Sequence, residues 1–121
     1  MADFKKLHVW HRAHKLALRS EQLATRFARQ KPNLAKQLER ASDSIPATIA
    51  EGRGRGSDAD FANYVSMAIG STTEVENHLQ RGYDGGVINK SDYEQTDGRD
   101  HPGPEDADRI AAHLAWPASP A

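Results

Sequence analysis

The stretch that decides the fold is "SIPATIAEGRGRGS", from Ser44 to Ser57. Pro46 lies inside a run whose apolar residues keep helical spacing on both sides of it. Proline lacks the N–H that would bond the carbonyl of Ser42, which costs an isolated helix about 3 kcal/mol. Because the apolar period resumes in register, the sequence predicts one kinked helix rather than two helices. We expect the hydroxyls of Ser42 or Ser44 to bond the freed carbonyls.

This second helix is bounded by residues that favour helix ends. Asn33 is a suitable N-cap, and the helix then runs towards Glu51. Gly52 is a natural C-terminal stop. The glycines of "GRGRG" predict a turn that reverses the chain into a third helix.

A first helix precedes this region, from Leu7 to Ala28. Its apolar residues, from Val9 to Phe27, alternate steps of four and three, and Trp10 widens the same face. Pro32 then breaks the pattern, because it disfavours helix at the residue before it.

The third helix is predicted from Asp58 to about Arg81, with Ser57 as its N-cap. Glu76 falls close to the apolar seam. A carboxylate buried there would need a partner, and the first helix offers many bases. Gly70 weakens the local helix propensity, and we expect it to mark the close approach of a neighbouring helix.

A fourth helix should begin at "SDYE", where Ser91 and Glu94 have the spacing of a capping box. It develops no apolar seam. The fold class predicted is all-α, an antiparallel up-down four-helix bundle with an incomplete or atypical fourth helix. Residues 1–95 form the bundle, and residues 96–121 form an atypical, polar C-terminal tail with a short helix near 106–115.

Composition narrows the possible functions. The chain has no cysteine, which excludes disulfides, thiolate metal sites and cysteine nucleophiles. We find no secretory signal and no apolar run long enough to span a bilayer, so we expect a cytoplasmic protein with no membrane partner. Residues 1–57 hold 12 Lys and Arg against 5 Asp and Glu, a net charge of +7, whereas residues 58–121 hold 4 against 12, a net charge of −8.

The basic half could attract a nucleic acid, or the two halves could attract each other within a bundle or between subunits. Arg53 and Arg55 stand beside the start of the third helix, whose free N–H groups favour anions. Asp58 and Asp60 already occupy that end, and the alternative is a turn in which the arginines pair with acids. The candidate nucleic-acid-binding residues are Lys5, Lys6, Arg12, Lys15, Arg19, Arg53 and Arg55.

No arrangement in the sequence points to catalysis. His8, His11 and His14 are three residues apart and share a face, but no carboxylate completes a metal site, so we interpret them as surface or interface histidines. Glu74 and Glu76 point to different sides of the helix, and they are not a general acid/base pair. We expect no enzyme activity, no metal and no cofactor.

The assembled motifs resemble the 23S rRNA intervening-sequence proteins, also called four-helix-bundle proteins. "FKKLHVWHRAHKLAL" is similar to the opening of that family, and "LAKQLERASDSIPATIAEGRGRGSDADFANYVSMAIGSTTEVENHL" is similar to its central signature. The accessory proteins of diversity-generating retroelements form a related group. The matching positions are Arg40, Ser44, Pro46, Glu51, Gly52, Gly54, Arg55, Phe61, Gly70, Ser71, Glu74 and Glu76.

The resemblance implies a homo-oligomeric ring, a pentamer, with no established enzymatic activity and with nucleic-acid binding inferred for basic relatives. It gives the matching residues a structural role in the bundle and the ring. The residues from Thr96 onward depart from the family, as if the original end were read in another frame. The leading hypothesis is a non-enzymatic oligomer that binds rRNA or another nucleic acid through its basic N-terminal half. The alternative is a protein-interaction adaptor or scaffold with no nucleic-acid role.

Overall fold

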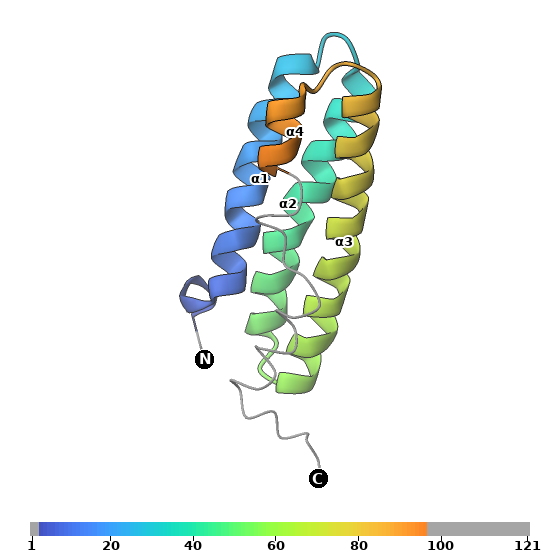
Figure 1. The fold of residues 1–121 in the computed structure, drawn as a ribbon. Coiled ribbons are helices and arrows are strands. Elements are labelled where there is room, and N and C mark those ends of the chain that lie inside the picture. Colours follow the sequence, from blue (N-terminus) through green and yellow to red (C-terminus); the bar gives the residue numbers. More distant parts are fainter. Residues whose placement is uncertain (1–2, 97–121) are drawn as a thin grey trace.

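The structure is a computed structural model of the chain, and it describes residues 3–96. Every element in this range is helical (Figure 1). The elements are the 3-10 helix η1 (Phe4–Lys6) and the α-helices α1 (His8–Phe27), α2 (Pro32–Gly54), α3 (Asp58–Asp84) and α4 (Lys90–Thr96).

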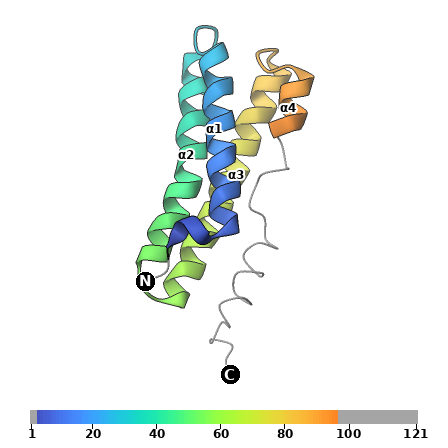
Figure 2. The same ribbon diagram turned by 90° about the vertical axis from the view of Figure 1, so that its left-hand side faces the viewer.

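The helices run alternately up and down, which confirms the predicted all-α bundle. α2 packs against both α1 and α3, and α4 contacts α1 and α3 near the loops that end α1 and α3 (Figures 1 and 2). α4 has seven residues, so the fourth position of the bundle is only partly filled by the described chain. The predicted tail begins at Thr96, which is the last residue of α4; its remaining residues 97–121, with the short helix predicted near 106–115, lie outside the described residues.

The core follows the predicted seam of α1. Each residue of the four-three pattern between Val9 and Phe27 is buried. Full burial of a large apolar side chain contributes about 1.5–3 kcal/mol to the free energy of folding, so burial of the seam stabilises the bundle. The largest fully buried side chains of the three long helices include Leu16, Leu38, Ile45, Ile49, Phe61 and Leu79.

α2 passes through Pro46 without interruption, as the sequence predicts, and the proline is buried. The Ser42 hydroxyl donates to the Glu39 carbonyl (3.1 Å) and the Ser44 hydroxyl to the Ala41 carbonyl (2.7 Å). Pro46 has no N–H to donate to the Ser42 carbonyl. The two hydroxyls bond carbonyls that precede it in the chain, so the prediction that a serine hydroxyl bonds the freed Ser42 carbonyl is wrong. The kink itself stays a prediction.

Both predicted ends of α2 are wrong by one or two residues. The helix begins at Pro32, with Lys31 in a non-helical conformation as its N-cap, rather than at a cap on Asn33. Proline suits the first helical position because its fixed φ matches the helix and its missing N–H needs no partner there. The helix ends at Gly54 rather than Gly52, and the turn is made at Gly56, whose φ is 89°.

The glycines of the helices divide into tight and open positions. A Cβ added at Gly52 would lie 2.4 Å from the Cβ of Tyr64, so α2 and α3 approach each other there. A Cβ at Gly82 would lie 2.5 Å from Cδ1 of Ile88, which begins the return of the chain to α4. No atom lies within 4 Å of a Cβ built at Gly70, and the predicted close approach at that glycine is wrong.

α3 begins as predicted, because the Ser57 hydroxyl accepts the Asp60 N–H at 3.1 Å. The helix extends beyond Arg81 to Asp84. Glu76 is exposed, so its carboxylate needs no buried partner, and His78 is buried instead. The buried face of α3 continues through Val75, Leu79 and Gly82, and Glu76 lies outside it.

Candidate nucleic-acid interface

The seven candidate basic residues lie in three places. Lys5 and Lys6 are exposed on η1, which contacts both α1 and α2. This brings them to the end of the bundle where α2 turns into α3 (Figures 1 and 2). The remaining candidates are Arg12, Lys15 and Arg19 along α1, and Arg53 and Arg55 at the turn between α2 and α3.

Arg55 is held against α3 by Tyr64. Its Nε and Nη2 donate to the Tyr64 hydroxyl at 3.1 and 2.7 Å, and its guanidinium lies 5.4 Å from the centre of the ring. The Tyr64 hydroxyl donates in turn to Glu51 (3.4 Å). The hydrogen bond to Tyr64, with the charge of Glu51 as a smaller cause, raises the pKa of Arg55 above its usual range. Arg55 thus links the two helices that the turn joins.

Arg53 makes the corresponding contact with Phe61. Its guanidinium lies 5.3 Å from the centre of the Phe61 ring, a distance at which a cation is attracted to an aromatic face. Its Nε is buried without a hydrogen-bond partner among the described residues. The sequence allowed a turn in which both arginines pair with acids. Instead, each guanidinium lies over an aromatic ring of α3. These contacts account for the two arginines as parts of the α2–α3 turn.

Arg19 is bonded to α4 at the surface of the bundle. Its Nη1 donates to the Gln95 carbonyl of α4 at 2.7 Å. Seven residues further along the same face of α1, Arg26 forms an ion pair with Asp92 at 2.8 Å. These contacts attach α4 to α1, so Arg19 serves the fold and is a poor choice for a ligand-binding residue.

An aromatic cluster occupies the outward face at the start of α1. The Trp10 and His14 rings are stacked, with centres 4.7 Å apart and planes 11° apart. Phe4 meets the edge of Trp10 at 5.0 Å, and His11 lies against Trp10 at 5.1 Å. The Lys5 ammonium is 6.0 Å from the centre of the Phe4 ring. We call this set, Phe4, Lys5, Trp10, His11 and His14, the aromatic–basic face.

Sequence reasoning missed this face as a candidate. It assigned Trp10 to the buried seam, whereas the indole is half-buried beside the core. The available signal was the spacing of four between Trp10 and His14, inside a stretch rich in lysine and arginine. Phe4 could not be placed, because its position depends on the turn of η1 back along α1.

The charge at the end of the bundle differs from the charge along α1. Near the α2–α3 turn, the two bases Arg53 and Arg55 are outnumbered by the three acids Glu51, Asp58 and Asp60. By contrast, residues 4–20 contain five lysines and arginines and no acid. A polyanion is therefore attracted to the outward face of α1 more than to the turn.

The three histidines do not act as a group. His8, His11 and His14 are all exposed. His11 donates through Nε2 to the Lys5 carbonyl, whereas His14 stacks on Trp10. Within residues 3–96, no group of three His, Asp or Glu side chains could hold a metal ion.

The residues that match the family motif have ordinary structural surroundings. Pro46 and Gly52 are buried, and Ser44 is half-buried with its hydroxyl on the Ala41 carbonyl. Oε2 of Glu74 lies 3.5 Å from Nε2 of the buried His78, which is longer than a typical hydrogen bond. The exposed members of the set are Arg40, Glu51, Gly54, Arg55, Gly70, Glu74 and Glu76.

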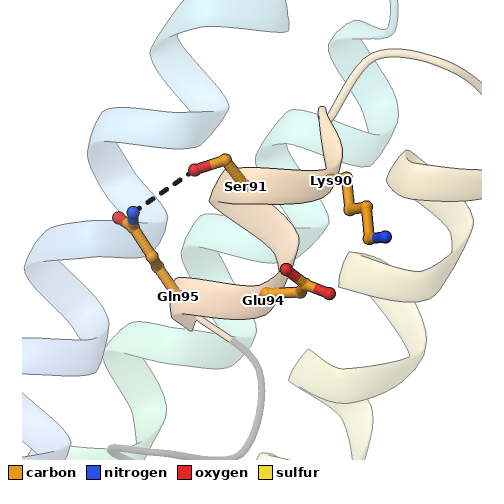
Figure 3. A pocket seen from close by; sticks show the side chains of 4 residues that line it. All are labelled: Lys90, Ser91, Glu94 and Gln95. Atoms are coloured by element: carbon orange, nitrogen blue, oxygen red, sulfur yellow. Dashed lines mark hydrogen bonds between the residues drawn. The ribbon is translucent and has the colours of Figure 1, made fainter.

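A surface hollow lies on α4 and is lined by Lys90, Ser91, Glu94 and Gln95 (Figure 3). Its four residues are exposed, and the Gln95 amide donates to the Ser91 hydroxyl at 3.3 Å. A lysine and a glutamate on one short helix offer no enclosed space and no concentration of charge. The hollow is therefore a weaker candidate than the aromatic–basic face.

These observations define a small helical bundle built on an apolar seam, with its arginine-rich turn fastened to aromatic rings. The family model of the 23S rRNA-intervening sequence protein matches residues 5–99. The chain belongs to this family, whose small helical proteins have no known catalytic role. A search among curated proteins finds no match. Among the described helices, none is long and apolar enough to cross a membrane.

Proposed function

We propose that this chain is a non-enzymatic, RNA-binding helical bundle that assembles into a homo-oligomer in the cytoplasm. The observation that carries the proposal is the outward face of α1 and η1. Residues 4–20 hold five lysines and arginines without an acid, and Lys5, Lys6 and Lys15 are exposed. A surface of this charge binds a phosphate backbone with release of counterions.

The distribution of charge also supports self-association. Residues 1–57 carry a net charge of +7, whereas the described residues 58–96 hold seven acids and two bases, a net charge of −5. Exposed bases outside the RNA-binding face, such as Lys36 and Arg40 on α2, can attract the acids of α3 in another copy. A contact between two different faces closes into a ring when the rotation between copies allows it, so a pentameric ring is the assembly that we propose.

RNA binding is tested by fluorescence anisotropy with labelled rRNA fragments at low and moderate salt. We expect affinity to fall steeply as salt rises. Replacing Lys5, Lys6 and Lys15 together by Gln should weaken binding and flatten the salt dependence by about one unit for each lost phosphate contact. The matched control replaces Lys31, Lys36 and Lys90 by Gln, because it makes the same change in net charge elsewhere on the bundle.

Two results would contradict the RNA proposal: no binding of rRNA fragments at low salt, or equal losses in the two triple variants. Assembly is tested separately by light scattering on the unmodified chain. A pentameric ring requires a mass five times that of the chain, and a monomer across the accessible concentration range would refute assembly.

The alternative is a protein-interaction adaptor. Leu18 is 49% exposed on α1 and Met67 is 58% exposed on α3, and both are the kind of side chain that a protein partner would cover. A partner recovered from the cell after nuclease treatment, and lost with Met67→Ser, would favour this function. Retention of the partner by that variant would count against Met67 as its contact.

A further inference from the structure

We infer that the aromatic–basic face takes single-stranded RNA, with unpaired bases stacking on the Trp10–His14 pair and the backbone lying along Lys5, Lys6 and Lys15. The inference rests on the proposed RNA binding and assigns it a site and a substrate class. It moves the binding surface from the arginine turn, where the sequence placed part of it, to the side of α1.

The geometry of the face suits base stacking. The Trp10 indole is packed on one side against the core, so it is a fixed support. The exposed His14 ring lies parallel to it at 4.7 Å, and Leu18 continues the same spacing of four with 49% of its surface exposed. The three side chains thus follow one another at steps of four along α1. When a nucleobase stacks on aromatic rings that are already fixed, the protein loses little conformational entropy.

The position of Phe4 gives this row of side chains an edge. η1 is held by the Asp3 side chain, which accepts the Lys5 N–H at 2.9 Å, and by the contact between His11 and the Lys5 carbonyl. These bonds place the Phe4 ring against Trp10 and leave the Lys5 and Lys6 side chains exposed beside it. The Lys5 ammonium, 6.0 Å from the centre of the Phe4 ring, is therefore a neighbour of the aromatic rings.

Charge and stacking together favour a single strand over a duplex. Every base in a single strand offers a ring face, and stacking on protein aromatics contributes to affinity with little dependence on sequence. In an RNA helix the bases are already stacked and only the backbone and the minor groove are accessible. The lysines would attract both forms, but the Trp10–His14 pair can add affinity for the unpaired form alone.

The test uses the full chain with Trp116→Phe, since the sequence has two tryptophans and this variant leaves emission from Trp10 only. It is titrated with a short single-stranded RNA and with the same sequence in a perfect duplex. We expect the single strand to quench Trp10 emission. In the same background, His14→Ala should lower single-strand affinity by about tenfold and leave duplex affinity nearly unchanged.

Two further variants separate stacking from folding. Trp10→Phe keeps an aromatic ring in the core contact and should retain most of the single-strand affinity, whereas Trp10→Leu should lose about tenfold or more. Tyr83→Leu is the matched control, because Tyr83 is stacked on Tyr93 with ring centres also 4.7 Å apart, between α3 and α4. Its RNA affinity should equal that of the unsubstituted chain. Circular dichroism of each variant verifies the helical fold.

The outcomes distinguish the two proposals. Binding of single-stranded RNA without quenching, and without loss in His14→Ala, overturns the stacking site and leaves RNA binding intact. Failure of both RNAs to bind refutes the proposed function itself. If Trp10 emission instead changes with protein concentration alone, and the His14→Ala variant lowers the mass measured by light scattering, the face is a subunit interface and the inference is wrong.

Discussion

Gly52 offers the sharpest test of the helix packing. The substitution Gly52→Ala places a methyl group 2.4 Å from the Cβ of Tyr64 and 3.0 Å from its Cγ. Carbon atoms at rest lie about 3.5–4.0 Å apart, so α2 and α3 must separate by roughly 1 Å or more. The Cβ of Tyr64 cannot rotate away from the added methyl group, because it is bonded directly to the backbone of α3.

The magnitude is a balance of two opposing effects. Overpacking of this kind costs about 1–3 kcal/mol, and we expect the upper part of that range because the contact is with a Cβ. Replacing glycine by alanine inside a helix returns about 1 kcal/mol. The net destabilisation is therefore about 2 kcal/mol, or a decrease of roughly 8–16 °C in Tm for a domain of this size.

Gly70→Ala is the matched control. Gly70 is also inside a helix, but no atom lies within 4 Å of its added Cβ, so only the gain in helix propensity remains. We expect an increase in stability of about 0.5–1 kcal/mol. Thermal and urea unfolding are followed by circular dichroism at one protein concentration, because assembly would couple stability to concentration. Equal effects of the two substitutions, or a neutral Gly52→Ala, would refute the packing argument.

Three further predictions concern the core, a cap and the turn. Leu38→Ala should destabilise the fold by about 2–5 kcal/mol because Leu38 is fully buried, whereas Leu18→Ala should change stability by less than about 0.5 kcal/mol, and urea unfolding compares them. Ser57→Ala removes the N-cap of α3 and should cost about 1 kcal/mol in the same assay, and a neutral result would show that the cap is not used. Tyr64→Phe keeps the ring beneath Arg55 but removes the hydroxyl that accepts two of its hydrogen bonds, so we expect a loss of about 1 kcal/mol or less in thermal unfolding. A larger loss would indicate that the turn depends on that hydroxyl more than its exposure suggests.

The helices could be predicted because each is determined by short-range pattern. The four-three spacing of α1 names the residues that are buried in the structure, and the cap at Ser57 starts α3 where the sequence placed it. The continuity of α2 through Pro46 was also predicted correctly, since the apolar period on both sides outweighs the loss of one hydrogen bond. Periodicity and capping act within a few residues of chain, and a single sequence contains them completely.

The glycines show where such reasoning fails. Gly52, Gly70 and Gly82 all interrupt helical patterns, yet Gly52 and Gly82 are packed closely and Gly70 faces open space. The neighbour of Gly52 is Tyr64 of another helix, and that of Gly82 is Ile88 beyond the end of its own helix. Which glycine is needed for close approach depends on these partners, and the local sequence does not name them.

The candidate interface was likewise predictable only in those properties that do not depend on tertiary contacts. The sequence established that residues 4–20 are basic and free of acid, because charge is a property of composition. It could not separate Arg19 and Arg55, which are bound to α4 and to Tyr64, from the exposed lysines of η1 and α1.

The sequence by itself therefore determined the helices, the seam that joins them, the opposite charges of the two halves and the family. Only the tertiary structure decided which basic side chains hold the fold together, and that Phe4 lies beside Trp10. The physical reason is that helix formation depends on neighbours along the chain, whereas the availability of a side chain for a ligand depends on what the fold brings against it.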